Sequence, residues 1–229
     1  MDEPQQLHTN RQYEEELRTL RADLLRMGGL VERQIAEAVG ALVERDSEKA
    51  RRTIAQDAEV NRMDIECEAR CIRLLALHQP AASDLRFITT GFKITADLER
   101  IGDNAVNICE RAIELNEQSQ LKPYIDLPRM AELAQSMVKD SLDAFMRNDT
   151  ALAEQVIARD DEVDALNHQI YRELLSYMVE EPKTIAQATR VLFVSKYLER
   201  IADHAANIAE NVIFMVKGKT IRHMDRSKR

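Results

Sequence analysis

The same segment occurs twice in this chain of 229 residues, one hundred positions apart. Residues 98–110 and 198–210 are identical at nine of thirteen positions. Upstream of each, residues 46–61 and 149–164 align without a gap and agree at seven of sixteen positions. An internal repeat of this kind indicates two copies of one supersecondary unit. The sequence therefore predicts two similar halves related by a pseudo-twofold axis.

The composition indicates that each half consists of helices. Aromatic residues make up only 4% of the chain, Trp is absent, and there are six Gly and five Pro. Few turn-formers and few β-formers leave long helices as the main content. Apolar residues also recur at spacings of three and four, as Leu17, Leu20, Leu24, Met27 and Val31 do. This is the pattern of a helix with one buried face, and we expect an all-α protein.

Breaks in this pattern set the helix boundaries of the first half. The polar start, residues 1–12, is expected to be disordered, and the predicted helices then cover 13–44, 47–77 and 82–116. Asp46 is a good N-cap for the second helix, which ends before Pro80 because the residue preceding a proline resists helical geometry. Residues 117–128, which contain two prolines, form the predicted linker.

The second half repeats this arrangement. Asp149 is the next N-cap, the fifth helix extends to about residue 179, and the sixth runs from Pro182 to Lys217 before Gly218 stops it. The predicted fold is all-α, with two tandem three-helix bundles at 10–117 and 127–218 and a basic C-terminal tail at 219–229. The tail either contacts an anionic membrane or an acidic partner, or is a solvated terminus.

Charge and hydropathy narrow the class of protein. A net charge of −8 argues against a general nucleic-acid binder. No apolar run approaches the roughly 20 residues that a membrane-spanning helix needs, and the N-terminus has no signal-peptide core. Three cysteines cannot all pair. We therefore expect a soluble, cytoplasmic protein.

The repeated segment carries a polar stripe. Glu99, Asp103, Asn107 and Glu110 fall within about 80° of one another on a helix, and roughly 140–180° from the apolar stripe of the same helix. The stripe therefore lies on the surface or lines a groove. Its second copy comprises Glu199, Asp203, Asn207 and Glu210.

The ordinary structural interpretation of this stripe is a solvated helix face without a ligand, but two features favour a bound ligand. Like charges at i and i+4 destabilise a helix by a few tenths of a kcal/mol, and Asn is a poor helix former. Both copies nevertheless keep the acids and place Asn at the same point. The simplest ligand is a hard cation, for which oxygen donors favour Mg²⁺, Mn²⁺ or iron; zinc stays open, because the pattern does not identify the metal.

The preceding helix of each half supplies a second set of candidate cation ligands, which would face the polar stripe. Its acids and amides are spaced i, i+4 and i+7: Asp57, Asn61 and Asp64 in the first half, and Asp160, Asp164 and Asn167 in the second. Asp161 is the alternative to Asp160 if the helix is shifted slightly. A charged helix face is the alternative here too.

Several other residues have plain structural explanations. Cys67 and Cys71 lie in an apolar stripe and are interpreted as small buried hydrophobic residues. His204 either adds a nitrogen ligand beside Asp203 or is a surface histidine. Arg100 and Arg200 balance the neighbouring acids.

Three parts of the sequence together resemble the PhoU family: residues 80–86, the twin Glu-Arg-Ile-(Gly/Ala)-Asp segments, and residues 216–223. The resemblance extends over residues 13–223. It implies two similar three-helix bundles, often in a homodimer, and a non-enzymatic role in keeping phosphate-starvation signalling off when phosphate is plentiful. The implied partners are the ATPase subunit of the phosphate ABC transporter and a membrane sensor histidine kinase, so that membrane contact is only indirect.

The resemblance also bears on the acidic residues. In some members of the family, Glu or Asp followed four residues later by Asp is linked to multinuclear metal binding. The motif maps onto Glu99 with Asp103 and onto Glu199 with Asp203. Asp160 and Asp164 match it as well, whereas in the first half Asn61 replaces the second acid after Asp57. This departure implies a weaker first site, or a different metal there.

Two other functions stay open at this stage: a metal-dependent enzyme that uses the carboxylates, and a plain helical scaffold without metal. The chain has no Glu-x-x-His, no His-Glu-x-x-His, no Gly-rich phosphate loop and no Gly-x-Ser-x-Gly. A non-enzymatic regulator is therefore favoured.

Overall fold

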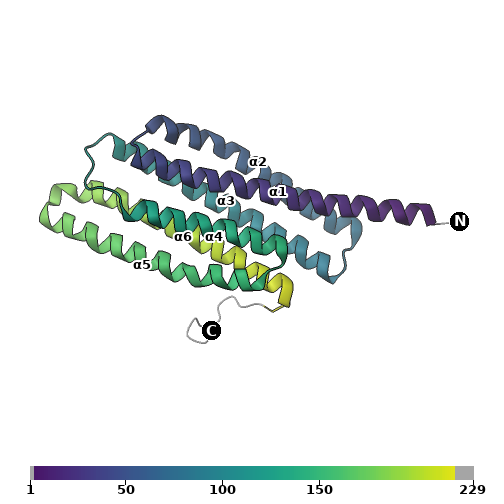
Figure 1. Ribbon diagram of the computed structural model, residues 1–229. Coiled ribbons are helices and arrows are strands. Elements are labelled where there is room, and N and C mark those ends of the chain that lie inside the picture. Colours follow the sequence, from purple (N-terminus) through teal and green to yellow (C-terminus); the bar gives the residue numbers. More distant parts are fainter. Residues whose placement is uncertain (1–2, 220–229) are drawn as a thin grey trace.

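Six long α-helices make up most of the computed structural model, which describes residues 3–219, with side chains from Arg11 onward. The described part contains no β-strand. Figure 1 shows the first three helices beside the last three, which confirms the predicted class and the two tandem three-helix bundles. The elements are α1 (Glu3–Val43), α2 (Ser47–His78), α3 (Ala82–Asn116), α4 (Asp126–Arg147), α5 (Thr150–Glu180), the 3-10 turn η1 (Pro182–Thr184) and α6 (Ile185–Lys217).

The predicted helix caps are confirmed. The carboxylate of Asp46 accepts a hydrogen bond from the backbone N–H of Lys49 at 2.9 Å. The carboxylate of Asp149 accepts from two backbone N–H groups at 3.0 Å each. Gly218 ends α6 with φ of +65°, a left-handed conformation that a residue without a side chain adopts readily. Each cap satisfies backbone groups that a helix end leaves without an intrahelical partner.

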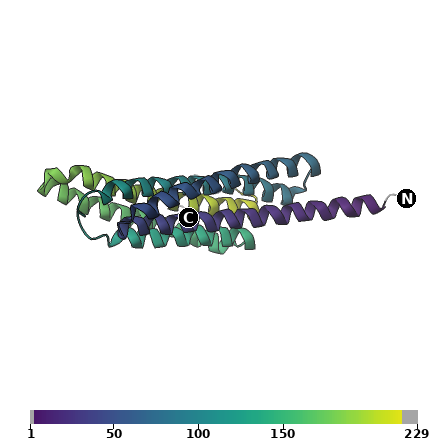
Figure 2. The ribbon, with the colours of Figure 1, turned by 90° about the horizontal axis from the view of Figure 1, so that it is seen from above.

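Three boundaries differ from the prediction. The first helix begins at Glu3, so the expected disorder is wrong for residues 3–12; this polar segment has good helix formers, and its proline lies in the first turn. Figure 2 shows α1 extending past the other helices at this end. The fourth helix begins at Asp126, inside the predicted linker, and the sixth begins only after η1. The predicted tail, 219–229, lies outside the described residues except for Lys219.

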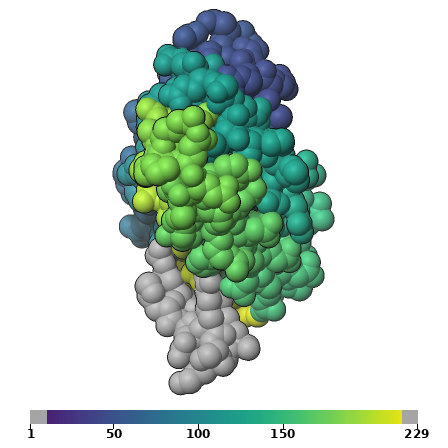
Figure 3. Space-filling model, turned by 90° about the vertical axis from the view of Figure 1, so that its left-hand side faces the viewer, coloured from purple at the N-terminus to yellow at the C-terminus, as the bar shows by residue number. Residues whose placement is uncertain are grey.

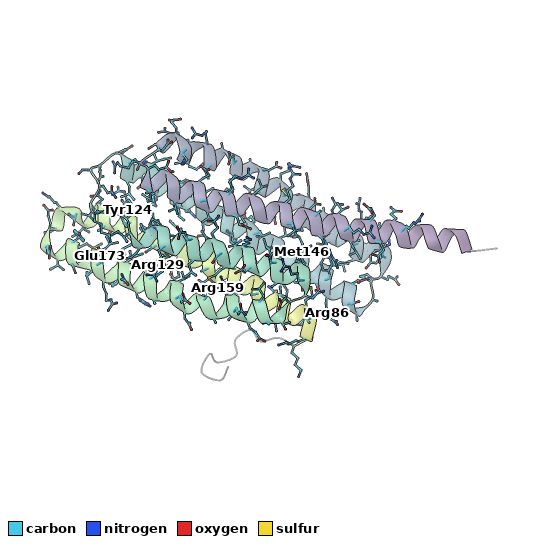
Figure 4. All side chains as sticks on the ribbon, in the orientation of Figure 1. Arg86, Tyr124, Arg129, Met146, Arg159 and Glu173 are labelled. Carbon is cyan, nitrogen blue, oxygen red and sulfur yellow. The ribbon has the colours of Figure 1, made fainter. Side chains whose placement is uncertain are left out.

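The two bundles join through an antiparallel pair formed by α3 and α6. At one end, Arg86 Nε donates to the carbonyl of Met215 at 2.8 Å, and Figure 4 shows Arg86 beside the end of α6. At the other end, Arg190 Nε donates to Glu114 Oε2 at 2.7 Å. The first and fourth helices also pack together, while α2 packs on α1 and α3, and α5 on α4 and α6. The outer helix is therefore α2 in the first bundle and α5 in the second.

The apolar faces of the helices meet in one core. Leu98, Ile101, Ala105 and Ile108 are fully buried on α3, as are the aligned residues of α6. Phe87 and Phe145 stack across the two bundles with ring centroids 5.2 Å apart. Since each helix keeps a polar face, none in the described residues is long and apolar enough to cross a membrane.

The three cysteines are buried, as was predicted for Cys67 and Cys71. Burial raises the pKa of the Cys67 thiol to about 11 and those of Cys71 and Cys109 to about 12. A thiol that stays protonated at neutral pH is a poor nucleophile and a poor metal ligand. These residues therefore contribute to packing.

The linker packs against the end of the molecule where α5 and α6 join. Lys122 is buried and forms an ion pair with Glu173. Gln187 donates to the carbonyl of Ser119 at 2.6 Å. Figure 4 places Tyr124 and Glu173 at this end, and Figure 3 shows the linker (teal) between α2 (blue, top) and α5 (green). These contacts hold the linker, which follows α3 of the first bundle, against the second bundle.

A glycine sets the distance between α1 and α4. A Cβ atom added at Gly28 would lie 2.1 Å from Leu142 Cδ1, far inside van der Waals contact. Leu142 is buried, so its side chain has little space into which it could move. The next residue, Gly29, is exposed and has no atom within 4 Å of the same position.

This pair of glycines gives a test of the helix contact. Gly28→Ala should be destabilising relative to Gly29→Ala by about 1–3 kcal/mol, the usual effect of overpacking a core. Gly29→Ala should stabilise the protein by up to about 1 kcal/mol through helix propensity alone. Chemical denaturation of both variants and the wild type measures the difference. Equal free energies of unfolding for the two variants would show that the close contact does not limit the packing.

Candidate functional site

The predicted acidic residues of the first bundle lie between α2 and α3. Burial and the neighbouring charge of Asp103 raise the pKa of Glu99, and Asp57 and Asp64 act on it in the same direction. The two helices therefore bring these four carboxylates within electrostatic range of one another, as the sequence predicted. We call the group of Asp57, Asp64, Glu99 and Asp103 the first acidic site.

Two amides hold Asp57. Gln34 Nε2, on α1, donates to Asp57 Oδ1 at 3.3 Å, and Asn61 Nδ2 donates to Asp57 Oδ2 at 2.9 Å. Burial raises the pKa of Asp57, and the charge of Asp103 raises it further, while the two amide hydrogen bonds lower it. Asn61 thus serves Asp57 as a hydrogen-bond donor in this structure.

Arg100 neutralises the α3 side of the first acidic site. Its guanidinium lies 3.0 Å from Asp103 and 3.4 Å from Glu99. This confirms that the arginine balances the neighbouring acids. The remaining predicted residues lie farther along the helix: Asn107 is one turn beyond Asp103, and Glu110 is exposed and pairs with Arg111 at 3.6 Å. Glu110 thus lies about two turns beyond Asp103, at the exposed end of the predicted stripe.

The second bundle forms a pocket of about 370 Å³ between α5 and α6. Burial raises the pKa of Asp203, and the charges of Asp160, Glu199 and Asp164 raise it further. We call these four residues the second acidic site. Asp160 is only 2% exposed, whereas Asp161 faces solvent, so the structure places Asp160 in the site. The pocket is lined by Ile157, Asp160, Arg200, Asp203, His204, Ala206, Asn207 and Glu210.

Glu199 is held by two neighbours. Asn167 Nδ2 donates to Glu199 Oε2 at 2.9 Å, and Lys196 forms an ion pair with the same carboxylate. Both neighbours also line a groove of about 510 Å³ along α5 and α6, in which Tyr171 and Phe193 are each about half exposed. An apolar groove therefore adjoins the second acidic site through the residues that hold Glu199.

One contact links the second acidic site to the first bundle. His204 Nδ1 lies 2.9 Å from Asp97 Oδ1, and both side chains are largely buried. The residue aligned with His204 in the first bundle is Asn104, which is buried and donates to the carbonyl of Arg100 at 2.7 Å. The two pseudo-equivalent positions therefore have different contacts.

The side-chain oxygen atoms of the two sites are the kind of ligand that a hard cation prefers. Each site gathers several carboxylates whose charges repel, and a cation would relieve that repulsion. In the first site Gly102 leaves space, because a Cβ there would lie 3.1 Å from Asp57 Oδ1 and 3.2 Å from Gln34 Oε1. That Gln34 oxygen is buried and has no hydrogen-bond partner among the described residues. Oxygen atoms of Asp57 on α2 and of Gln34 on α1 thus converge on the space beside Gly102.

The carboxylates are nevertheless spread along the helices. In the described part of the chain, no three histidine, cysteine or acidic side chains stand close enough together to ligate one ion. The sites thus have the donors for a cation, and side-chain rotations would have to gather them around it.

Sequence reasoning missed two residues of these sites. Gln34 lies on the buried face of α1, where a polar residue within an apolar stripe was the only signal. Asp97 lies six residues before Asp103 and was not singled out, because its partner is 107 residues away in the sequence. Both roles depend on contacts between helices, which a linear pattern does not contain.

Comparison with known proteins covers both bundles. A family model described as the PhoU domain matches residues 24–112 and again 127–212. A Pseudomonas putida protein named "phosphate-specific transport system accessory protein PhoU homolog" is 43% identical over 95% of this chain and 85% of its own length. An Aquifex aeolicus protein of the same name is 44% identical over 91% of this chain and 94% of its own length.

Two solved structures resemble the fold. The crystal structure of PhoU from Pseudomonas aeruginosa has a TM-score of 0.87 at 42% identity and covers 90% of this chain and 100% of its own. The phosphate transport system regulatory protein PhoU from Streptococcus pneumoniae has a TM-score of 0.86 at 31% identity and covers 91% and 99%.

The raised pKa of Asp203 predicts a pH-dependent effect on stability. Its pKa is higher in the folded than in the unfolded state, so ionisation destabilises the fold as the pH rises through the folded value. Without metal, Asp203→Asn should raise Tm at pH 7.5, and the gain should vanish below about pH 3, where the carboxyl is largely protonated in both the folded and the unfolded state. Glu132→Gln, on the solvent face of α4, is the control. Calorimetry in a chelator that shows no gain at pH 7.5, or a gain equal at both pH values, would contradict this assignment.

Proposed function

The chain belongs to the PhoU family, and on that basis we propose that it is a non-enzymatic negative regulator of phosphate uptake and phosphate-starvation signalling. The observation that carries this proposal is the pair of PhoU domain matches, one on each bundle. Relatives over 40% identical are named as accessory proteins of the phosphate-specific transport system. The Streptococcus pneumoniae structure is titled as a regulatory protein of that system. The proposed action is by protein contact.

The proposed partners are the ATPase subunit of the phosphate ABC transporter and a sensor histidine kinase. A protein that couples these two has to reach both on the same side of the membrane, and we therefore propose a cytoplasmic location and no direct insertion into the bilayer. A homodimer is the proposed assembly. The accessory role named for the relatives supports association with the transport machinery.

We further propose that the two acidic sites bind cations. The proposed ligands of the first are Asp57, Glu99 and Asp103, with Asn61, Asn107 and Glu110 as further donors; in the second they are Asp160, Asp164, Glu199 and Asp203, with Asn207 and Glu210. The mutual repulsion that raises the pKa of Glu99 and Asp203 supports this assignment. A bound ion would supply positive charge between the two helices of each site. Iron, manganese, magnesium and zinc are the candidate metals.

The regulatory proposal is tested in cells and by affinity capture. Deletion of the gene should switch on phosphate-starvation expression in phosphate-rich medium, and a plasmid copy should restore repression. The tagged full-length protein should capture the transporter ATPase and the kinase from lysate, whereas the tag alone should capture neither. Unchanged signalling on deletion, together with failure to capture either partner, would refute the proposal.

The cation proposal is tested by metal analysis. After loading and dialysis, Asp103→Ala should lose the metal of the first site and keep that of the second, and Asp203→Ala should do the reverse, because each removes a carboxylate from one site only. Asp161→Ala, the exposed acid next to Asp160, is the matched control and should keep both. Mass spectrometry of the intact protein measures the metal content. Equal content in all four proteins would exclude ligand roles for these aspartates and favour a plain helical scaffold.

A further inference from the structure

We propose that His204 is a nitrogen ligand of the second acidic site and that Asp97, from the first bundle, orients it. The second site would then have oxygen and nitrogen donors, while the first would have oxygen donors only. This inference rests on the cation binding proposed above. Since imidazole suits zinc and iron, and carboxylates alone suit magnesium and manganese, the two sites would prefer different cations.

The hydrogen bond to Asp97 determines the tautomer of His204. A carboxylate only accepts hydrogen bonds, so Nδ1 carries the hydrogen in the 2.9 Å contact with Asp97 Oδ1. In a neutral ring, Nε2 then has the lone pair that ligates a metal. A carboxylate that binds the second ring nitrogen of a ligating histidine is a recurring arrangement at zinc sites, where it fixes the ring and raises its basicity.

The position of His204 places its ring on the wall of the pocket that several of the proposed ligands line. It lines the same pocket as Asp160, Asp203 and Glu210, and it follows Asp203 directly in the sequence. Its ring is 24% exposed, so the contact with Asp97 holds it within the protein wall while leaving it accessible to an ion. The ring and the carboxylates therefore face one cavity.

The first bundle lacks this arrangement. Asn104 takes the aligned position and is directed to the backbone of its own helix. Its Asp57 is held by two amides, and Asp164 takes the position in the second bundle that Asn61 has in the first. The second site thus has a further carboxylate where the first has an amide that donates to Asp57. The difference between the bundles therefore favours tighter binding of a borderline metal by the second.

The test compares Zn²⁺ and Mg²⁺ binding by the full-length protein and three variants. His204→Asn installs the residue that the first bundle has, and Asp97→Asn replaces the carboxylate with a neutral amide of the same shape, which is a weaker acceptor and can also donate. We expect each to weaken Zn²⁺ binding by about tenfold to a hundredfold, as loss of such partners does, with Mg²⁺ binding changed less than Zn²⁺ binding. His168→Asn, an exposed histidine on α5 outside the pocket, should bind both ions as the wild type does.

A second measurement separates ligation from a structural role. In protein with ¹⁵N-labelled histidine, NMR should show the His204 ring with its hydrogen on Nδ1 before metal, and a shift of Nε2 on addition of Zn²⁺. Asp97→Asn should disturb the tautomer without unfolding the metal-free protein, which circular dichroism checks. Zn²⁺ binding that depends on Asp203 but leaves the His204 signals unmoved would overturn this inference alone. No binding of either ion by the wild type would overturn the cation proposal and this inference together.

Discussion

The antiparallel contact between α3 and α6 is the interaction on which the rest of the structure depends. Leu98, Ile101 and Ala105 are fully buried on α3, as are their counterparts on α6, and burial of a large aliphatic side chain contributes about 1.5–3 kcal/mol. The hydrogen bonds of Arg86 and Arg190 at the two ends of the pair fix its register. Because the apolar seams of both helices are used here, their polar stripes must face outward, toward α2 and α5.

This orientation creates both acidic sites. Each forms where a polar stripe meets the acids of the neighbouring outer helix, and in each the carboxylates raise one another's pKa. In the first bundle, Gln34, Asn61 and Arg100 offset the repulsion from within the protein. In the second, Asn167 and Lys196 contact Glu199, and the charge of Lys196 also lowers the pKa of Asp203. Nearly identical segments have therefore acquired different electrostatic surroundings, because their neighbours come from less similar parts of the repeat.

The sequence predicts what depends on neighbours along the chain. The caps at Asp46 and Asp149, the stop at Gly218 and the acidic stripe all follow from residue type and from the helical period of 3.6. The contacts of Gly28 with Leu142 and of Asp97 with His204 depend instead on how helices slide and rotate against one another. No periodic pattern carries that information. The start of α1 was missed for another reason: a polar segment without apolar periodicity still forms a helix when its residues favour one.

The same geometry bears on how the two bundles communicate. Each acidic site is built from helices of its own bundle, so an ion bound in either one stabilises the contact between two neighbouring helices. Only the pair of Asp97 and His204 joins an acidic site to the other bundle among the contacts described here. A ligand that favours one arrangement of that pair must also favour one arrangement of α3 against α6, since binding and conformation are linked reciprocally. Under the cation binding proposed above, occupancy of the second site would therefore act on the contact between α3 and α6, whereas occupancy of the first would act within its own bundle.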